Sequence, residues 1–226
     1  MKNYLLIGFI SSLIFTSCKH DSLYEPIDEP PIVDTECDPN TVYFINDVLP
    51  IIQSSCAISG CHGSGSAQDG VDLSTYAGIM EEVQAFDAND SKLYKVMIDN
   101  DNNDVMPPSP YNRLNADQIL LIKNWINQGA QNNECSDCNT TAVTFAQTIS
   151  PIIQNNCQGC HSGTAPQGNL SLTNFTQIKT IADNGKLLGT INHINGFVPM
   201  PYNQPQLSDC KIDQITLWVN AGALNN

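Results

Sequence analysis

The stretch of this chain best suited to chemistry is Cys157-Gln158-Gly159-Cys160-His161. Two thiols three positions apart, followed at once by an imidazole, form the pattern that attaches a haem covalently and ligates its iron. The two sulfurs can each form a thioether with a vinyl group of the porphyrin, while His161 takes the proximal position on the iron. A zinc site would need a second pair of ligands at suitable spacing, and a thioredoxin-like redox pair does not need the histidine. The stretch therefore predicts a c-type haem site.

A stretched version of the same pattern begins at Cys56, with Cys61 and His62 completing it. Four residues separate these two thiols, against two in the stretch that begins at Cys157. A disulfide beside a histidine is the alternative interpretation. Gly60 would let the additional residues bulge, so that both sulfurs still reach the ring edge. We expect a second haem here, and therefore two haem c groups in the protein.

The chain from residue 41 onward is a duplication, which places the two stretches at equivalent positions. The correspondences run in order through both halves: Phe44 with Phe145, Pro50-Ile51-Ile52-Gln53 with Pro151-Ile152-Ile153-Gln154, Leu73 with Leu172, Tyr76 with Phe175, Met106-Pro107 with Met200-Pro201, and Trp125 with Trp218. We call residues 41–133 the first copy and residues 142–226 the second copy, and expect residues 134–141 to be a linker.

Helical signals dominate both copies. Asp47 and Thr148 are suitable N-cap residues for a first helix that carries proline in its first turn and ends at the cysteines. A short helix is expected near Tyr76 or Phe175. No strand pattern competes, so the sequence predicts an all-α fold of two small tandem domains with long loops.

The last helix of each copy has the clearer boundaries. Asn115 and Gln118 form a capping box, and Gly129 suits the C-terminal cap. In the second copy the matching helix runs over residues 208–222, with apolar residues at steps of three and four.

The duplication also nominates the sixth ligand of each haem iron. Met106 and Met200 correspond, and each precedes a proline that favours an extended loop over a helix. Met80 and Met97 have no methionine counterpart in the second copy, so we expect them in the core. His193 competes with Met200, although a solvated loop histidine is the simpler interpretation. Histidine and methionine ligation raises the reduction potential of a haem.

Four further cysteines are available for disulfides: Cys37, Cys135, Cys138 and Cys210. Cys37 and Cys138 stand at equivalent positions before the two copies, which favours pairing Cys37 with Cys135 and Cys138 with Cys210. The closely spaced Cys135 and Cys138 form the rival pair. Nine cysteines in total favour an oxidising compartment.

The N-terminus agrees with export. Lys2 precedes an apolar run over residues 4–15 that is too short to span a bilayer, and small residues precede Cys18. This resembles a bacterial lipoprotein signal over residues 1–17, with Cys18 lipidated; a plain secretory signal is the alternative. Residues 18–40 are acidic and rich in proline, without helix or strand periodicity, and predict a tether. We expect the protein in the cell envelope, anchored to a membrane by lipid and facing the periplasm or the cell exterior.

The charge of the chain restricts its partners. With 23 acidic and 9 basic side chains, the formal net charge is -14. This balance argues against nucleic acid and favours redox proteins with basic docking faces. An acidic surface that keeps the protein soluble is an equally compatible interpretation.

The motifs described above resemble class I c-type cytochromes, and in particular the planctomycete-type haem domains of bacterial envelope proteins. The resemblance rests on the approach to the haem cysteines, on the Met-Pro pairs, and on Trp-Ile-Asn-Gln-Gly-Ala near the end of the first copy. It implies that the first and last helices of each copy cross, with Phe44 or Phe145 near Trp125 or Trp218. The spacing at Cys56 departs from the usual pattern.

These expectations add up to a di-haem carrier of single electrons outside the cytoplasm rather than an enzyme. The main alternative is a di-haem peroxidase-like enzyme with one open iron position, which the matched methionines Met106 and Met200 argue against. A second alternative is a haem-bearing accessory module of an envelope assembly.

Overall fold

The computed structural model describes residues 30–34, 37–101 and 104–226. The predicted signal segment and Cys18 lie outside the described residues. The described chain is mostly helical, as the sequence predicts. Its α-helices are α1 (Leu49–Ser55), α2 (Tyr76–Met80), α3 (Lys92–Ile98), α4 (Ala116–Asn127), α5 (Ser150–Asn156), α6 (Phe175–Asp183), α7 (Lys186–Ile191) and α8 (Asp209–Asn220). Five shorter helical turns are Phe44–Val48 and Phe145–Ile149, both π-helical, and Gln68–Gly70, Ala88–Asp90 and Gln167–Asn169, all 3-10.

The first helix of each copy begins earlier than the sequence suggested. A π-helical turn precedes α1 and another precedes α5, so the helical path starts at Phe44 and Phe145 instead of at Asp47 and Thr148. Thr144 caps the second of these turns, because its side chain accepts from the backbone N–H of Gln147. The prediction that both helices end at the cysteines is confirmed, since α1 and α5 stop one residue before them.

The last helix of the first copy has the predicted ends. Asn115 accepts from the backbone N–H of Gln118, whose side chain accepts in return from the N–H of Asn115. Gly129 follows the helix with a φ of 103°, the left-handed conformation that glycine adopts at low cost. Helix α8 covers the matching stretch, with Ser208 as its N-cap residue.

The described residues form two separate hydrophobic clusters, one in each copy. In the first, the rings of Phe44 and Trp125 stack with centroids 5.2 Å apart. In the second, Phe145 and Trp218 lie 5.7 Å apart. These pairs join the start of the first helix to the last helix, so the contact that the resemblance implied is present twice.

Helices α3 and α7 were not foreseen, because the sequence analysis expected one short helix between the first and last helices. Each packs beside the last helix of its own copy. Their buried faces carry Met97 and Ile191, which are each 3% exposed. Met80 packs at the edge of the first cluster, so both unmatched methionines belong to the core, as expected.

Two short strands, which the sequence analysis did not expect, accompany the helices of this mostly helical fold. β1 (Ile32–Asp34) pairs in parallel with β2 (Asn133–Cys135), so three residues of the predicted tether belong to a sheet. Their sequences lie about a hundred residues apart, and three-residue strands have too short a pattern to be recognised from the sequence.

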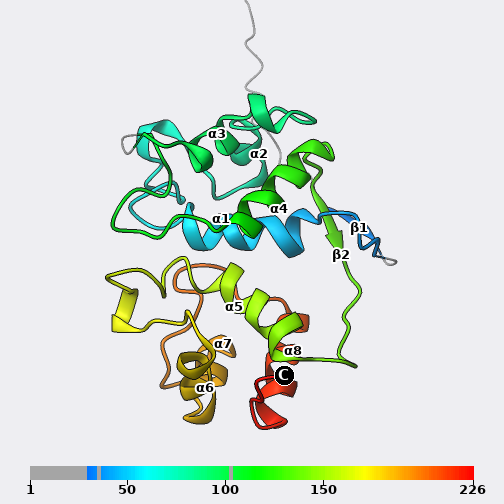
Figure 1. Ribbon diagram of the computed structural model, residues 1–226, viewed down its shortest axis with the longest axis vertical. Coiled ribbons are helices and arrows are strands. Elements are labelled where there is room, and N and C mark those ends of the chain that lie inside the picture. The colour runs from blue at the N-terminus through cyan, green and yellow to red at the C-terminus, as the bar shows by residue number, and fades with distance from the viewer. Residues whose placement is uncertain (1–29, 35–36, 102–103) are drawn as a thin grey trace, which may run out of the picture.

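Both predicted disulfides are present. Cys37 bonds to Cys135 and Cys138 to Cys210, with Cα atoms 5.5 and 5.6 Å apart, and the rival pairing of Cys135 with Cys138 is wrong. In Figure 1 the first copy lies above the second, with α1 over α5 and β2 leading down to the second copy. Within the described ranges, the structure has no helix long and apolar enough to cross a membrane.

Candidate functional site

The two predicted haem-binding stretches follow α1 and α5 directly, and we call residues 56–62 and 157–161 the first and second attachment segments. In each, the first cysteine ends the helix, and its N–H donates to the carbonyl of Ile52 or Ile153. The chain then turns back on itself. The N–H of His161 donates to the carbonyl of Cys157 at 2.9 Å, and the N–H of His62 donates to the carbonyl of Cys56 at 3.2 Å.

The two additional residues of the first attachment segment are accommodated as a bulge. Gly60 has a φ of 86° and an open surrounding, so a glycine suits the position. After the histidines the two copies resume the same path, because Leu73 and Leu172 donate their N–H to the carbonyls of His62 and His161, both at 2.8 Å. The longer spacing therefore leaves the histidine in the same backbone setting as the shorter one.

Both histidines are oriented in the same way. The Nδ1 atom of His62 lies 3.2 Å from the carbonyl oxygen of Val71, and the Nδ1 atom of His161 lies 3.2 Å from that of Leu170. A carbonyl can only accept, so each Nδ1 carries the proton and each Nε2 keeps a free lone pair. Within the described chain, neither Nε2 has a hydrogen-bond partner. This is the tautomer that a metal-ligating histidine needs.

The four thiols of the attachment segments are free, whereas the other four described cysteines are in disulfides. Burial raises the pKa of Cys56 and of Cys157 to about 12, and the neighbouring thiols Cys61 and Cys160 add to the effect. At neutral pH these sulfurs are protonated, so they behave as apolar groups at the surface of each core.

Met106 and Met200 both lie in loops outside helices, as predicted, and both are partly buried. The N–H of Met106 donates to the carbonyl of Val96 on α3 at 2.9 Å. Similarly, the N–H of Met200 donates to the carbonyl of Thr190 on α7 at 3.1 Å. The unforeseen helices thus hold the two methionine loops at equivalent places.

His193 is exposed, and its Nε2 lies 3.2 Å from the carbonyl oxygen of Met200. The expected loop position of this histidine is therefore confirmed, and it stays beside the methionine with which it competes. The same loop exposes large apolar side chains: Ile194 51%, Phe197 38%, Val198 56% and Tyr202 63%. Exposed apolar side chains that lie together in one loop indicate a surface that binds an apolar ligand or partner.

The donor set of each copy fits a covalently bound haem. Two free thiols, a histidine with an available Nε2 and a methionine in a fixed loop are the protein groups that hold a c-type haem. Among the described residues, no cluster of three or more His, Cys, Asp or Glu side chains is arranged for a bare metal ion.

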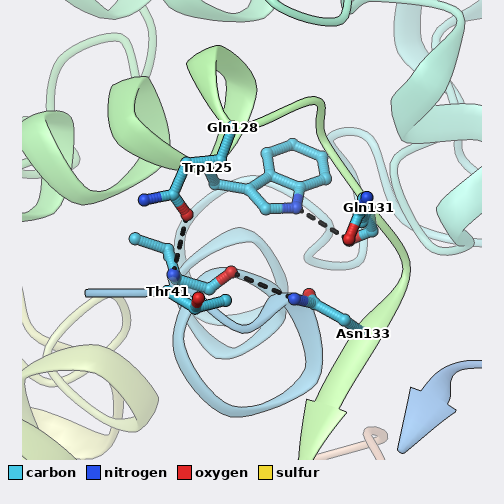
Figure 2. A pocket seen from close by; sticks show the side chains of 6 residues that line it. Thr41, Trp125, Gln128, Gln131 and Asn133 are labelled. Atoms are coloured by element: carbon cyan, nitrogen blue, oxygen red, sulfur yellow. Dashed lines mark hydrogen bonds between the residues drawn. The ribbon is translucent and has the colours of Figure 1, made fainter. Parts of the chain in front are cut away.

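The cavity in Figure 2 is a different place. Its volume is about 240 Å³, and it is lined by Thr41, Val42, Trp125, Gln128, Gln131 and Asn133. Hydrogen bonds cross it, including one from the indole N–H of Trp125 to the carbonyl of Gln131 at 2.9 Å. None of its lining residues belongs to an attachment segment, so this cavity belongs to the packing around the end of α4 and not to a haem site.

Sequence reasoning missed one charged group near the second attachment segment. Lys211 on α8 donates through Nζ to the carbonyl of Asn46 at 3.2 Å, which joins the second copy to the first. Burial lowers the pKa of Lys211, against the opposing effects of Asp47 and Cys157, and burial raises the pKa of Asp47. The repeat could not reveal this group, because the equivalent residue in the first copy is the uncharged Gln118.

Comparison with known proteins supports the assignment for the first copy. Residues 59–110 match the family model described as planctomycete cytochrome C. The matched range contains Cys61, His62 and Met106. No curated protein and no solved structure matches the chain. The match supports a planctomycete-type cytochrome c domain and a haem-binding role in electron transfer.

Proposed function

We propose, with the similarity to planctomycete cytochrome C as the premise, that this protein is an extracytoplasmic di-haem c-type cytochrome that carries single electrons. Each copy acts as one cytochrome c-like domain. The first holds its haem through Cys56 and Cys61, and the second through Cys157 and Cys160. His62 and His161 are the proximal ligands, and Met106 and Met200 are the distal ones.

The observation that carries the proposal is the matched orientation of the two histidines. The Nδ1–H of each histidine donates a hydrogen bond to the backbone carbonyl of the residue nine positions further along the chain, at 3.2 Å in both copies. This hydrogen bond fixes the tautomer and makes Nε2 a better ligand. The second copy lies outside the range of the family match, and the same hydrogen bond at His161 supports a haem there as well.

The chain contributes position and environment to the chemistry. When bound, the haem supplies a one-electron iron couple. The cysteines of the attachment segments would hold the haem through thioethers, and Met106 and Met200 would supply the remaining iron ligands. A closed iron changes little between its redox states, which suits an electron carrier and excludes peroxide from the metal. The net charge of -14 favours docking of basic redox partners.

We also propose that the protein works in the cell envelope. The disulfides of the structure suit an oxidising compartment. The signal-like N-terminus with Cys18 supports a lipid anchor in a membrane.

Intact mass of the purified full-length protein tests the haem content. We expect an increase equal to two covalently attached haems, and an increase of one in Cys157→Ala/Cys160→Ala. A wild-type increase of one haem that is abolished in Cys157→Ala/Cys160→Ala would show that the first attachment segment holds no haem. Extraction of all haem into acidified organic solvent would refute the c-type assignment altogether.

Spectroscopy of the distal ligands tests the carrier function. The oxidised protein is expected to be low-spin at both irons, with the weak far-red band of methionine-ligated ferric haem, and to bind carbon monoxide poorly after reduction. Met200→Ala opens one of the two irons. The matched control is Met97→Leu, because Met97 is a buried core methionine and its replacement leaves both ligand sets unchanged.

Two results would change the assignment. If His193→Gln and not Met200→Ala opens the second iron, the distal ligand is the loop histidine. A wild-type protein with one high-spin haem that turns over peroxide supports a peroxidase instead of a carrier.

A further inference from the structure

The surface between the two copies is built from the attachment segments themselves. Ser54, two residues before Cys56, donates through Oγ to the carbonyl of Asn155 at 2.8 Å, and Asn155 lies two residues before Cys157. In addition, the sulfur of Cys160 lies 3.7 Å from the carbonyl oxygen of Ser54. Helices α1 and α5 therefore pack against each other at the ends that lead into the two segments.

Gly159 shows how tightly the segments fit. A Cβ atom at this position would lie 2.0 Å from the carbonyl oxygen of Ser54, closer than any real Cβ contact. The contact with the first copy therefore requires a glycine between the two cysteines of the second attachment segment.

The methionine loops reach across the same surface in both directions. Asn112, in the loop after Met106, donates to the hydroxyl of Ser162 at 3.0 Å, directly after the second attachment segment. Gln204, in the loop after Met200, donates to the carbonyl of Ala57 at 2.9 Å, inside the first attachment segment. Each loop is thus held by a residue inside the attachment segment of the other copy or directly after it.

The last helices repeat this exchange. Gln118 of α4 lies 3.4 Å from Asn155 Oδ1, while Lys211, its counterpart on α8, reaches Asn46 before α1. Contacts that recur in both directions characterise an interface with approximate two-fold symmetry. Residues two positions apart are at most about 7 Å apart along the chain, so Cys160 Sγ lies within roughly 11 Å of the Cys56 backbone.

We propose that the two copies form one redox unit, in which each methionine loop is fixed by the attachment segment of the other copy and an electron exchanges directly between the two haems. This inference rests on the proposed function, since it requires a haem on each segment. In the exchange one iron passes from Fe(II) to Fe(III) as the other passes from Fe(III) to Fe(II). One electron moves, and no proton, ligand or covalent bond changes; one-electron redox proteins supply and remove it.

A redox titration of the full-length di-haem protein, followed by visible and electron paramagnetic resonance spectra, tests the proposal. Two unit charges roughly 15 Å apart, at an effective dielectric constant of about 20, interact strongly enough to change the equilibrium constant for reduction of either haem about sixfold. We therefore expect that reducing one haem lowers the electron affinity of the other about sixfold. The fully oxidised protein should also show spin–spin broadening.

Two variants change the contact between the copies without replacing a haem ligand. Gly159→Ala must separate Cys160 from Ser54, and we expect it to reduce both the sixfold interaction and the broadening. Gln204→Ala removes a hydrogen bond from an amide side chain to a backbone carbonyl. Its control is Gln214→Ala, which removes the same kind of bond, to the carbonyl of Asn139 at 2.8 Å, away from the segments. Carbon monoxide binding should increase in Gln204→Ala and stay at the wild-type level in the control.

The outcomes separate this proposal from the assignment on which it depends. Two covalent haems that titrate independently and show no spin interaction in the wild-type protein would overturn the redox unit and leave the cytochrome assignment intact. A wild-type protein without two covalent haems overturns both. If Gly159→Ala loses its fold, the wild-type titration and the comparison of Gln204→Ala with Gln214→Ala still decide.

Discussion

Removal of the disulfide between Cys138 and Cys210 should destabilise the second copy by about 4 kcal/mol. The bond links residues separated by 72 positions, so it closes a long loop in the unfolded chain. The loop-closure relation gives an entropy of about -15 cal/mol/K for this length, or roughly 4.4 kcal/mol at 25 °C. Both cysteines are only partly buried, so replacement by serine adds little cost from lost packing.

Urea unfolding of Cys138→Ser/Cys210→Ser, followed by far-ultraviolet circular dichroism, measures the loss. With an m value of about 2 kcal/mol/M, the midpoint should fall by about 2 M. Cys37→Ser/Cys135→Ser provides the comparison, because its sequence separation of 98 predicts a similar loss of about 4.7 kcal/mol in the first copy. A loss below about 1 kcal/mol in the second copy, with the first copy behaving as predicted, would refute the loop-closure reasoning.

Three further predictions concern charge, packing and the N-terminus. Burial lowers the pKa of Lys211 from 10.5. Just below pH 10.5 the unfolded chain therefore binds more protons than the folded chain, so the free energy of unfolding increases as the pH rises. Urea unfolding at a series of pH values should show this increase in the wild-type protein and not in Lys211→Met. Ile153→Ala, at a side chain with 0% exposure, should cost about 2–5 kcal/mol by the same assay, whereas Leu217→Ala, at 44% exposure, should stay within about 0.5 kcal/mol. Cys18→Ser should move the protein from the membrane fraction to the soluble fraction, and a variant that stays membrane-bound would exclude a lipid on Cys18.

Much of each copy was predictable because its signals are local. A helix end depends on a few neighbouring residues, so the capping box of Asn115 and Gln118 could be identified without tertiary information. The π-helical turns before α1 and α5 were missed because Asp47 and Thr148 are residue types that favour the N-cap, although both lie inside the helical path. There the preceding Phe44 and Phe145 are drawn into the helical path by packing on the tryptophans of the last helices.

Both disulfides were predictable for a different reason, since the duplication made Cys37 and Cys138 equivalent. The pairing of β1 with β2 was not, because three-residue strands distant in sequence have no periodic pattern. Their contact depends on where the chain enters and leaves the first copy.

The sequence by itself determined the cysteine and histidine segments, the matched methionines and the helices that end at the cysteines, because spacing and capping act over a few residues. Only the tertiary structure decided how the copies meet. No local pattern indicates that Gly159 lacks a side chain because the carbonyl of Ser54, in the other copy, occupies that space. Gln118 and Lys211 differ in charge at equivalent positions, so no repeat signal marked them. Contacts of this kind depend on the relative orientation of two folded units, and that orientation is fixed by the sum of many long-range contacts rather than by any local pattern.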